Sequence, residues 1–210
     1  MENHWEDPEH AAHYLARADE LPHRHEAEAV LLGDLEPVLP GRVLDAGCGG
    51  GRLTGLVLDA FPGSTAVGVD LSPTMLEVAR GHLPADGSAV LVRHDLERPL
   101  PAGAPFDRPF DAVVSSFAVH HVDGDRKRTL YAELAGMLAP GGILANLDIV
   151  ASPTPALHRR WRDEMGAEDD PADHLADLAP QLAWLRDAGL DDVDCIWKWR
   201  SLSLMRGRRP

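Results

Sequence analysis

The sequence predicts a three-layer α/β fold: a seven-stranded, mostly parallel sheet with helices on both faces and an antiparallel C-terminal hairpin. Short apolar segments with a period of two alternate with amphipathic segments with a period of 3.6 over most of the 210 residues. Strands separated by helices form βαβ units, whose strands run parallel and whose crossovers are right-handed. A chain of this length is expected to form one domain with a full hydrophobic core.

Five short apolar segments are the predicted parallel strands. They comprise residues 42–46, 65–69, 89–93, 110–115 and 143–150. The fourth, FDAVVS, is nearly continuous in apolar residues, which is typical of a strand buried on both faces.

Helices are predicted between these strands. Residues 52–60 and 125–138 are amphipathic, and Pro140-Gly141-Gly142 signals the end of the second of these helices. Ser72 followed by Pro73 predicts the N-cap and first turn of a helix that extends to about His82.

The remaining segments flank this alternating core. Residues 8–36 are predicted to be helical and to pack over the ligand edge of the sheet. After Val150 we expect a helix over 156–165, an acidic loop over 166–171, a helix over 172–188, and a hairpin formed by 192–199 and 201–206. The single domain would then consist of an N-terminal helical lid (1–40), a ligand-binding core (41–150), and roof helices with the closing hairpin (151–210).

A glycine-rich loop, VLDAGCGGGRL, follows the first predicted strand. Gly47, Gly49 and Gly51 have no Cβ atoms where the chain turns from strand to helix, which permits positive φ and close approach of a ligand. In an open α/β sheet, ligands bind beyond the carboxyl ends of the strands, near this crossover. The loop therefore predicts a ligand site, although many glycine turns are only tight turns.

Two acids after the next strands specify the ligand further. Asp70 ends the second strand, 23 residues after Gly47, where an acid accepts both hydroxyls of a ribose. Asp95 follows the third strand, where a carboxylate could accept a hydrogen bond from an adenine amine. Together with the glycine loop, the two acids favour an adenosine ligand over separate roles as loop acids.

The loop spacing argues against the common phosphate-bearing adenosine ligands. It is G-x-G-x-G rather than the dinucleotide pattern G-x-G-x-x-G, and Asp45 two positions earlier suits an ammonium better than a phosphate. Neither Tyr14 nor Tyr131 has a lysine four residues later, as a short-chain dehydrogenase requires. The Gly-Lys-Ser/Thr sequence of a P-loop is absent.

At this point the chain resembles the class I S-adenosylmethionine-dependent methyltransferases, in the small-molecule branch. Their motifs are matched in order over about residues 43–150 by VLDAGCGGG, VGVDLSPTML, HDLE, FDAVVSSFAVHHV and LAPGGIL. The tail, WLRDAGLDDVDCIWKWRSLSLMRG, resembles the end of that branch, with Leu190 where Phe is commoner. The resemblance implies a Rossmann-like fold, S-adenosylmethionine as cofactor, and methyl transfer to a small-molecule acceptor at O, N or C.

The resemblance also implies roles for individual residues. Asp45, Gly47 and Gly49 would surround the methionine part of the cofactor, Asp70 the ribose, Leu71 and Met75 the adenine face, Asp95 and Leu96 the adenine edge, and Ser115 and Ser116 the floor below the sulfonium. Tyr14 and Arg17 lie three residues apart, hence on one helix face. Tyr14 would face the substrate, and Arg17 could meet the cofactor carboxylate.

Methyl transfer from a sulfonium is an in-line displacement on an activated carbon, so the protein mainly has to position the nucleophile. A base is needed only when the acceptor must lose a proton. His120 and His121, in the loop after the fourth strand, are the candidate bases; the alternative is that they only orient the loop or touch the cofactor.

Other polar and aromatic residues are candidates for the substrate chamber. Asn146 and Asp148 alternate along the fifth strand, and either could face substrate or end in solvent; Trp161 could line the chamber or simply pack. His120, His121, Asp123 and Asp125 suggest a metal site by residue type alone, so no metal is expected.

Composition excludes several partner classes. The chain has 34 acidic and 20 basic residues and a net charge of −14, which argues against nucleic acid. No apolar run reaches the roughly 20 residues of a membrane span, and the N-terminus lacks a signal-peptide core, so a cytoplasmic location is expected. Residues 115–118 also lack the Asn/Asp-Pro-Pro-aromatic sequence used to methylate planar amide or base nitrogens.

Two competing functions remain. One is a different reaction on the cofactor itself, such as formation of carboxy-S-adenosylmethionine. The other is a non-catalytic cofactor-binding partner protein, which intact acids at Asp45, Asp70 and Asp95 disfavour. The sequence leaves open the identity of the acceptor and whether the protein is a monomer or a homodimer.

Overall fold

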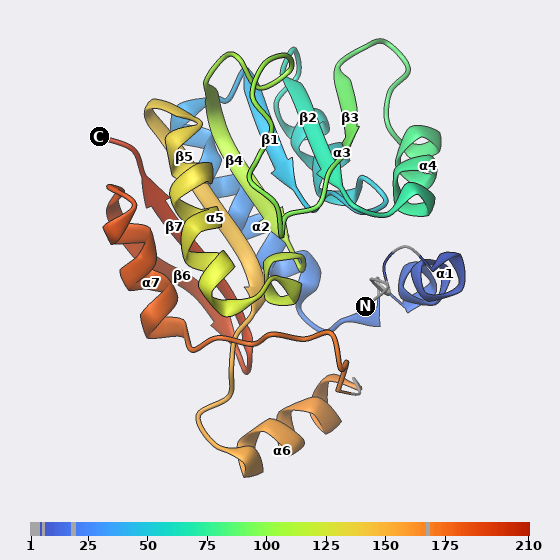
Figure 1. The fold of residues 1–210 in the computed structure, drawn as a ribbon, viewed down its shortest axis with the longest axis vertical. Helices are drawn as coiled ribbons and strands as arrows, with labels where there is room; N and C mark the ends of the chain where they lie inside the picture. Colours follow the sequence, from blue (N-terminus) through green and yellow to red (C-terminus); the bar gives the residue numbers. More distant parts are fainter. Residues whose placement is uncertain (1–4, 6, 18–19, 167–168) are drawn as a thin grey trace.

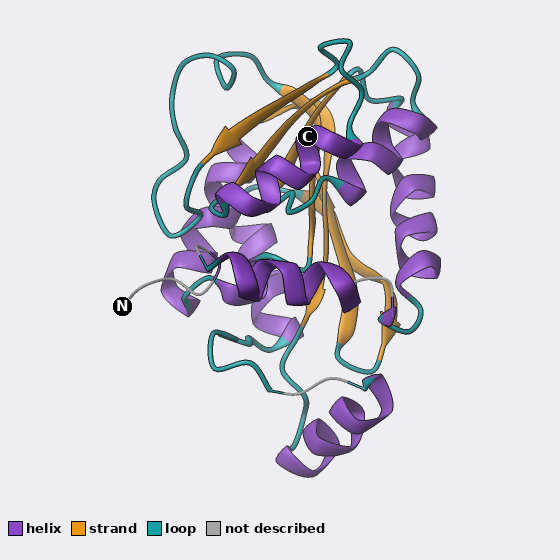
Figure 2. Ribbon diagram, turned by 90° about the vertical axis from the view of Figure 1, so that its right-hand side faces the viewer, coloured by secondary structure: helices purple, strands orange, loops and turns teal. Residues whose placement is uncertain are grey.

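A computed structural model describes residues 5, 7–17, 20–166 and 169–210 of the chain. The described residues form a seven-stranded sheet between two layers of helices (Figures 1 and 2). The strand order is β3-β2-β1-β4-β5-β7-β6. The predicted fold class is therefore confirmed.

The strands are β1 (Arg42–Ala46), β2 (Thr65–Asp70), β3 (Ala89–Arg93), β4 (Phe110–Ser116), β5 (Leu138–Ile149), β6 (Asp191–Trp199) and β7 (Leu202–Arg208). The helices are α1 (Pro8–Arg17), α2 (Arg24–Leu35), η3 (Glu36–Val38), α3 (Arg52–Ala60), α4 (Pro73–His82), η4 (Val119–His121), α5 (Gly124–Gly136), α6 (Pro155–Met165) and α7 (Leu178–Asp187). Strands β1 to β5 pair in parallel, whereas β7 is antiparallel to both of its neighbours.

Alternating side chains of the strands build a core on each face of the sheet. Val43 of β1 belongs to the core covered by α2 and α3, whereas the next residue, Leu44, belongs to the core covered by α5 and α7. Both residues are at most 1% exposed. The sheet is therefore buried on both sides, as the apolar character of its strands indicates.

The boundary between α5 and β5 differs from the prediction. The helix ends at Gly136, and β5 begins at Leu138, before Pro140-Gly141-Gly142 rather than after it. These three residues lie inside the strand, where its pairing with β4 is irregular between Phe110 and Ala112. The Pro-Gly-Gly signal therefore marks a distortion of the strand.

Two predicted helices are also corrected. The N-terminal helical region is divided into α1 and α2, with His23 at φ 62° immediately before α2. The predicted helix over 172–188 begins only at Leu178, and the preceding residues form an irregular segment whose backbone bonds to the loop after β4, through His174 N–H and His120 O at 2.8 Å. A local pattern could not reveal this tertiary partner.

The carboxyl ends of the parallel strands point toward α1 and α6 (Figure 1). Helix α1 packs against α4, and α6 lies beyond the end of β5. Among the described residues, no helix is long and apolar enough to cross a membrane.

Candidate active site

A cavity of about 360 Å³ lies where β1, β2 and β4 end. Its lining residues come from the loops that follow β1 to β4, from α4, and from the N-terminal helices α1 and α2. This is the edge at which an open α/β sheet binds its ligand. The cavity is thus formed by the loops at one end of the sheet together with the helices around them.

The glycine loop bends sharply between β1 and α3. The N–H groups of Gly47 and Cys48 both donate to Val69 O, at 2.8 and 2.9 Å, and Gly47 has φ 77°. A Cβ atom on Gly47 would lie 2.1 Å from the Cβ of Ala118, in the loop after β4. Glycine is therefore required here because two loops touch, as well as for its backbone conformation.

Asp45 is a buried acid at the inner wall of the cavity. It is 1% exposed, and its Oδ2 accepts a hydrogen bond of 2.6 Å from Thr54 Oγ1. Oδ1 has no hydrogen-bond partner in the described part of the chain. Burial raises the pKa of Asp45 to about 7, and the nearby charge of Asp70 adds to the effect while Thr54 opposes it. Oδ1 is thus placed to accept a donor from a ligand.

Asp70 ends β2 and holds two backbone turns. Its Oδ2 accepts from Gly49 N–H and its Oδ1 from Ser72 N–H, each at 2.8 Å. Burial raises the pKa of Asp70, although both backbone hydrogen bonds oppose this. The carboxylate is fixed in orientation and lines the cavity.

The predicted adenine-contacting residues all line the cavity. Leu71 lies between β2 and α4, Met75 lies in the first turn of α4, and Asp95 and Leu96 follow β3. Met75 is 1% and Leu96 8% exposed, so their side chains give an apolar slot, while Asp95 lies at its more open side. Such a slot suits the flat face of a nucleobase.

The two serines at the end of β4 occupy different environments. Ser116 lines the cavity, and its buried Oγ has no hydrogen-bond partner among the described residues. Ser115 is not among the lining residues; its Oγ donates to Ala46 O at 2.7 Å. The prediction that both form the floor is corrected, because neighbouring side chains of a strand point in opposite directions.

Two arginines that the sequence did not single out line the cavity beside the glycine loop. Arg24 of α2 and Arg52 of α3 both donate to the buried carboxylate of Glu28, at 2.9 and 2.8 Å. Burial would raise the pKa of Glu28, but the hydrogen bonds from Arg52 and Arg24 lower it overall. The predicted cation, Arg17, and Tyr14 lie in α1, and their side chains are outside the described part of the structure.

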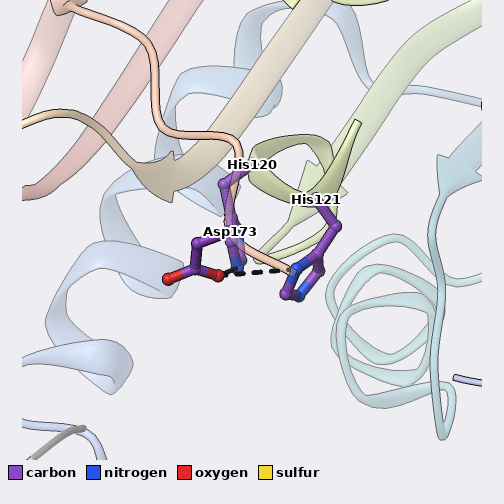
Figure 3. A group of neighbouring side chains, drawn as sticks. All are labelled: His120, His121 and Asp173. Carbon is purple, nitrogen blue, oxygen red and sulfur yellow. Dashed lines mark ion pairs between the residues drawn. The ribbon is translucent and has the colours of Figure 1, made fainter. Parts of the chain in front are cut away.

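His120 and His121 lie in η4, and Asp173 approaches them from the irregular segment before α7 (Figure 3). His120 is buried, with its Nδ1 2.5 Å from Asp148 Oδ1 and its Nε2 3.5 Å from Asp173 Oδ1. His121 lines the cavity and its Nδ1 is 3.5 Å from the same Asp173 oxygen. Of the two histidines, His121 is therefore the one exposed to a ligand, and His120 lies behind it.

The other residues predicted for the substrate chamber do not line this cavity. Asp148 and Asn146 are each 1% exposed, so neither is a solvated strand end. Asp148 contacts His120, while Asn146 Nδ2 donates to Tyr131 OH at 2.9 Å. Trp161 belongs to α6, and Lys198 Nζ lies 5.5 Å from the centroid of its ring.

Sequence comparison gives the family. Residues 43–142 match the family described as "Methyltransferase domain". A protein of Methylobacterium nodulans named trans-aconitate 2-methyltransferase is 33% identical over 207 residues, which cover 95% of this chain and 74% of that protein. The chain belongs to the S-adenosylmethionine-dependent methyltransferases.

Other relatives agree with this assignment. A trans-aconitate 2-methyltransferase of Streptomyces avermitilis is 32% identical to the methyltransferase over 94% of this chain and 74% of its own length. The match to a protein of the same name from Acidovorax sp. (strain JS42) is 35% identical and covers 54% of that relative. The methyltransferase is thus an enzyme whose cofactor is S-adenosylmethionine.

Solved structures share the fold of the methyltransferase. Human N-acetylserotonin methyltransferase, in complex with S-adenosylmethionine, superimposes with a TM-score of 0.69 at 16% identity, covering 98% of this chain and 57% of that one. An O-methyltransferase family protein from Burkholderia thailandensis superimposes with a TM-score of 0.66 at 21% identity, covering 96% of this chain and 71% of that one.

Several residues of the site were missed by the sequence analysis of this methyltransferase. Arg24 and Asp173 belong to segments without a motif, and only the fold brings them to the cavity and to the histidines. Phe117 lines the cavity with φ 53° and lies 5.1 Å below the Arg24 guanidinium. Trp5 also lines it, with its ring 5.0 Å from that of His121. Phe117 directly follows Ser115 and Ser116 in the sequence. Its position after β4 could therefore have identified it as a residue of the cavity.

Proposed function

We propose that this enzyme transfers the methyl group of S-adenosylmethionine to a small-molecule acceptor that bears a carboxylate. The observation that carries this proposal is the cavity, which is lined by Asp45, Asp70 and His121. The acceptor class is supported by the relatives, since trans-aconitate is a tricarboxylic acid.

The polar residues of the cavity support one orientation of the cofactor. We propose that its ammonium group meets the free Oδ1 of Asp45, and that its carboxylate meets Arg24 or Arg52 rather than Arg17. The ribose hydroxyls would meet Asp70 and the adenine would lie between Leu71, Met75 and Leu96, with its edge at Asp95. Charges of opposite sign then match at both ends of the methionine part.

The sulfonium would lie near Ser116, with its methyl group directed toward His121. A carboxylate acceptor is already ionised at neutral pH, so its attack needs no base. The histidines would then hold the acceptor in line with the methyl group. For a hydroxyl acceptor, His121 would instead accept the proton, with His120 positioning it.

Asp70→Asn provides the test of cofactor binding. It keeps the shape of the side chain but removes the charge that would accept from the ribose, and we expect the affinity for S-adenosylhomocysteine to fall about 10–100-fold in calorimetry. The matched control is Asp86→Asn, because Asp86 accepts from Ser88 N–H at 2.9 Å in the same turn geometry outside the cavity. Equal affinities of both variants would contradict the proposed ribose contact.

The reaction itself is tested by single-turnover release of S-adenosylhomocysteine with a panel of small mono-, di- and tricarboxylic acids, followed by mass spectrometry. We expect release together with one methyl ester. Binding without release from any metabolite extract would support a non-catalytic partner protein. A modified cofactor in place of a methylated acceptor would support the competing reaction on the cofactor, including formation of carboxy-S-adenosylmethionine.

The remaining sequence predictions stay predictions. They are the lid formed by residues 1–40, the substrate roof formed after residue 150 with Trp161 facing the acceptor, and the cytoplasmic location. The net charge of −14 supports an acceptor other than nucleic acid.

A further inference from the structure

We propose that His120, His121 and Asp173 bind a divalent transition-metal ion at the acceptor end of the cavity, and that this ion holds the acceptor. The ion site is argued from the geometry of the three side chains. Its role toward the acceptor rests on the proposed function.

The three potential ligand atoms already converge (Figure 3). Asp173 Oδ1 is 3.5 Å from His120 Nε2 and 3.5 Å from His121 Nδ1, and one ligand atom from each of the three side chains lies within 4.8 Å of the others. His121 Nδ1 also lies 3.4 Å from Ala172 O, so this nitrogen exchanges that hydrogen bond for the ion when the ion binds. Ligands bound at about 2.1 Å in a tetrahedral arrangement are about 3.4 Å apart. Two of the three pairs therefore match the spacing that a bound ion would impose.

Asp148 fixes His120 in the state needed for coordination. The His120 Nδ1 and Asp148 Oδ1 atoms are 2.5 Å apart, and the same Asp148 oxygen accepts from Ile149 N–H at 2.9 Å. When the Nδ1–H group donates a hydrogen bond to this carboxylate, Nε2 carries no proton and its lone pair is directed toward Asp173. A carboxylate behind a metal-binding histidine is the common outer-shell arrangement.

Arg162 holds the carboxylate ligand in a similar way. Its guanidinium lies 2.8 Å from Asp173 Oδ2, which leaves Oδ1 facing the two histidines. Both side chains are largely buried, at 10% and 9% exposed. The cluster is thus supported from β5 through Asp148 and from α6 through Arg162.

The donor set specifies the class of ion. Two imidazoles and one carboxylate suit zinc, cobalt, nickel or ferrous iron, whereas magnesium and calcium prefer oxygen ligands. Three protein ligands leave a coordination position open, as in catalytic zinc sites. Because His121 also lines the cavity, that position would be accessible to a bound acceptor.

An ion here would bind one carboxylate oxygen of the acceptor and leave the other to attack. The attacking oxygen forms a bond to the methyl carbon as the carbon–sulfur bond breaks, and its electrons return to sulfur. The products are a methyl ester and S-adenosylhomocysteine, with no proton released. The ion would act as a template that orients the acceptor.

The sequence suggested Asp123 and Asp125 as the acidic partners of the histidines. In the structure, Asp123 accepts a hydrogen bond from Asp125 N–H and caps α5 instead. Asp173 takes the position, from a segment about fifty residues further along the chain. Spacing along the sequence therefore could not reveal the cluster.

Cobalt titration of the metal-stripped full chain tests the site directly. We expect visible absorption bands that saturate at one ion per chain, and zinc should abolish them by competition. Asp173→Asn and His121→Ala should each weaken cobalt binding by more than about 100-fold, and Asp148→Asn by about 10–100-fold. The control is His23→Asn, which removes a histidine paired to Glu26 at 2.9 Å, a pair that shares no partner with the cluster.

Absence of saturable cobalt binding, or equal binding by wild type and Asp173→Asn, would overturn the proposal. Unchanged circular dichroism of Asp173→Asn separates lost ligation from misfolding. Methyl transfer that survives complete metal removal would refute the ion's role while leaving the proposed function intact. Loss of S-adenosylhomocysteine binding by Asp70→Asn is independent of the metal and tests the proposed function alone.

Discussion

At the residue scale, Asp45 combines burial with an unsatisfied oxygen at the cavity. Its pKa of about 7 means that the free enzyme keeps the proton over the range in which an ordinary aspartate has lost it. Only the ionised form attracts the ammonium of a cofactor. The proposed contact therefore predicts a pH-dependent affinity.

Between about pH 5 and about pH 7 the affinity for S-adenosylmethionine should rise nearly tenfold per pH unit, then level off. The affinity rises with pH because the pKa of Asp45 is raised to about 7. Below this pH, Asp45 must lose a proton before it can bind the ammonium group. For the same reason, the free energy of unfolding of the free enzyme should fall as pH rises through this range. Calorimetry at several pH values measures the affinity.

Asp45→Asn should bind the cofactor more weakly, with little pH dependence between about pH 5 and about pH 7. Asp86→Asn, an exposed change, should retain the wild-type profile. Asp70 and the arginines at positions 24 and 52 line the same cavity and stay in place in both variants. If the affinity for the cofactor rose equally with pH in wild type and in Asp45→Asn, a group other than Asp45 would cause the pH dependence.

Residues in motifs could be placed from the sequence, and residues outside motifs could not. Asp45 is the penultimate residue of its strand and Asp70 the last of its own, so their edge of the sheet follows from the parallel topology. Arg24 and Asp173 reach the site through the packing of α2 and of the segment before α7. Those placements depend on contacts far apart in the sequence, which local periodicity does not contain.

At the element scale, the loop after β1 touches the loop after β4 at Gly47. Gly47→Ala would put a methyl group 2.1 Å from the Cβ of Ala118 and strain a residue at φ 77°. We expect the free energy of unfolding to fall by about 2–5 kcal/mol, as measured by urea denaturation. Cofactor affinity should fall as well, because both loops line the cavity.

Gly63→Ala separates the two causes. Gly63 has φ 90°, but a Cβ there would meet nothing within 4 Å. Its cost should be about 1 kcal/mol, from the backbone alone. If the two variants lose equal stability, contact between the loops contributes nothing.

Lys127 of α5 connects this helix to η4 and to the segment before α7. Its ammonium donates to the carbonyl oxygens of His120, Val122 and His174, and burial lowers its pKa. Lys127→Met fills the space but leaves these buried acceptors without their donor. We expect a loss of about 2–4 kcal/mol in the free energy of unfolding.

The other lysine of the chain is the control. Lys198 is exposed and lies 5.5 Å from the ring of Trp161, so Lys198→Met should cost less than about 1 kcal/mol. If both variants lost the same free energy of unfolding, the hydrogen bonds from the Lys127 ammonium to the three carbonyl oxygens would contribute little to stability. Denaturant titration of both variants decides between these outcomes.

At the scale of the whole molecule, the sheet was predictable and the boundaries of its helices were less so. Each parallel strand is a short apolar segment that can be recognised in the sequence, and the helices between these segments indicate that the strands run parallel. The helix expected over 172–188 begins at Leu178 because the preceding backbone bonds to η4. Pro140-Gly141-Gly142 is accommodated in β5 because β4 pairs with β5 both before these residues, at Leu138, and after them, from Ile143.

The proposed cofactor site depends on the whole fold, since the walls of the cavity come from β1, β2, β4, α2 and the loops between them. An unfolded chain has no such cavity, so a ligand that binds there stabilises only the folded state. S-adenosylhomocysteine at about one hundred times its Kd should therefore add about 2.7 kcal/mol to the free energy of unfolding. For a chain of this size, that corresponds to a rise in Tm of about 5–10 °C.

The same ligand concentration should stabilise Asp70→Asn by only about 0.4–1.4 kcal/mol, because its expected Kd is about 10–100-fold higher. Asp86→Asn should keep the full shift. Differential scanning calorimetry with and without ligand measures both. If Asp70→Asn kept the full shift, the ligand would be held elsewhere on the molecule, and the cavity at the ends of β1, β2 and β4 would lose its assignment as the cofactor site.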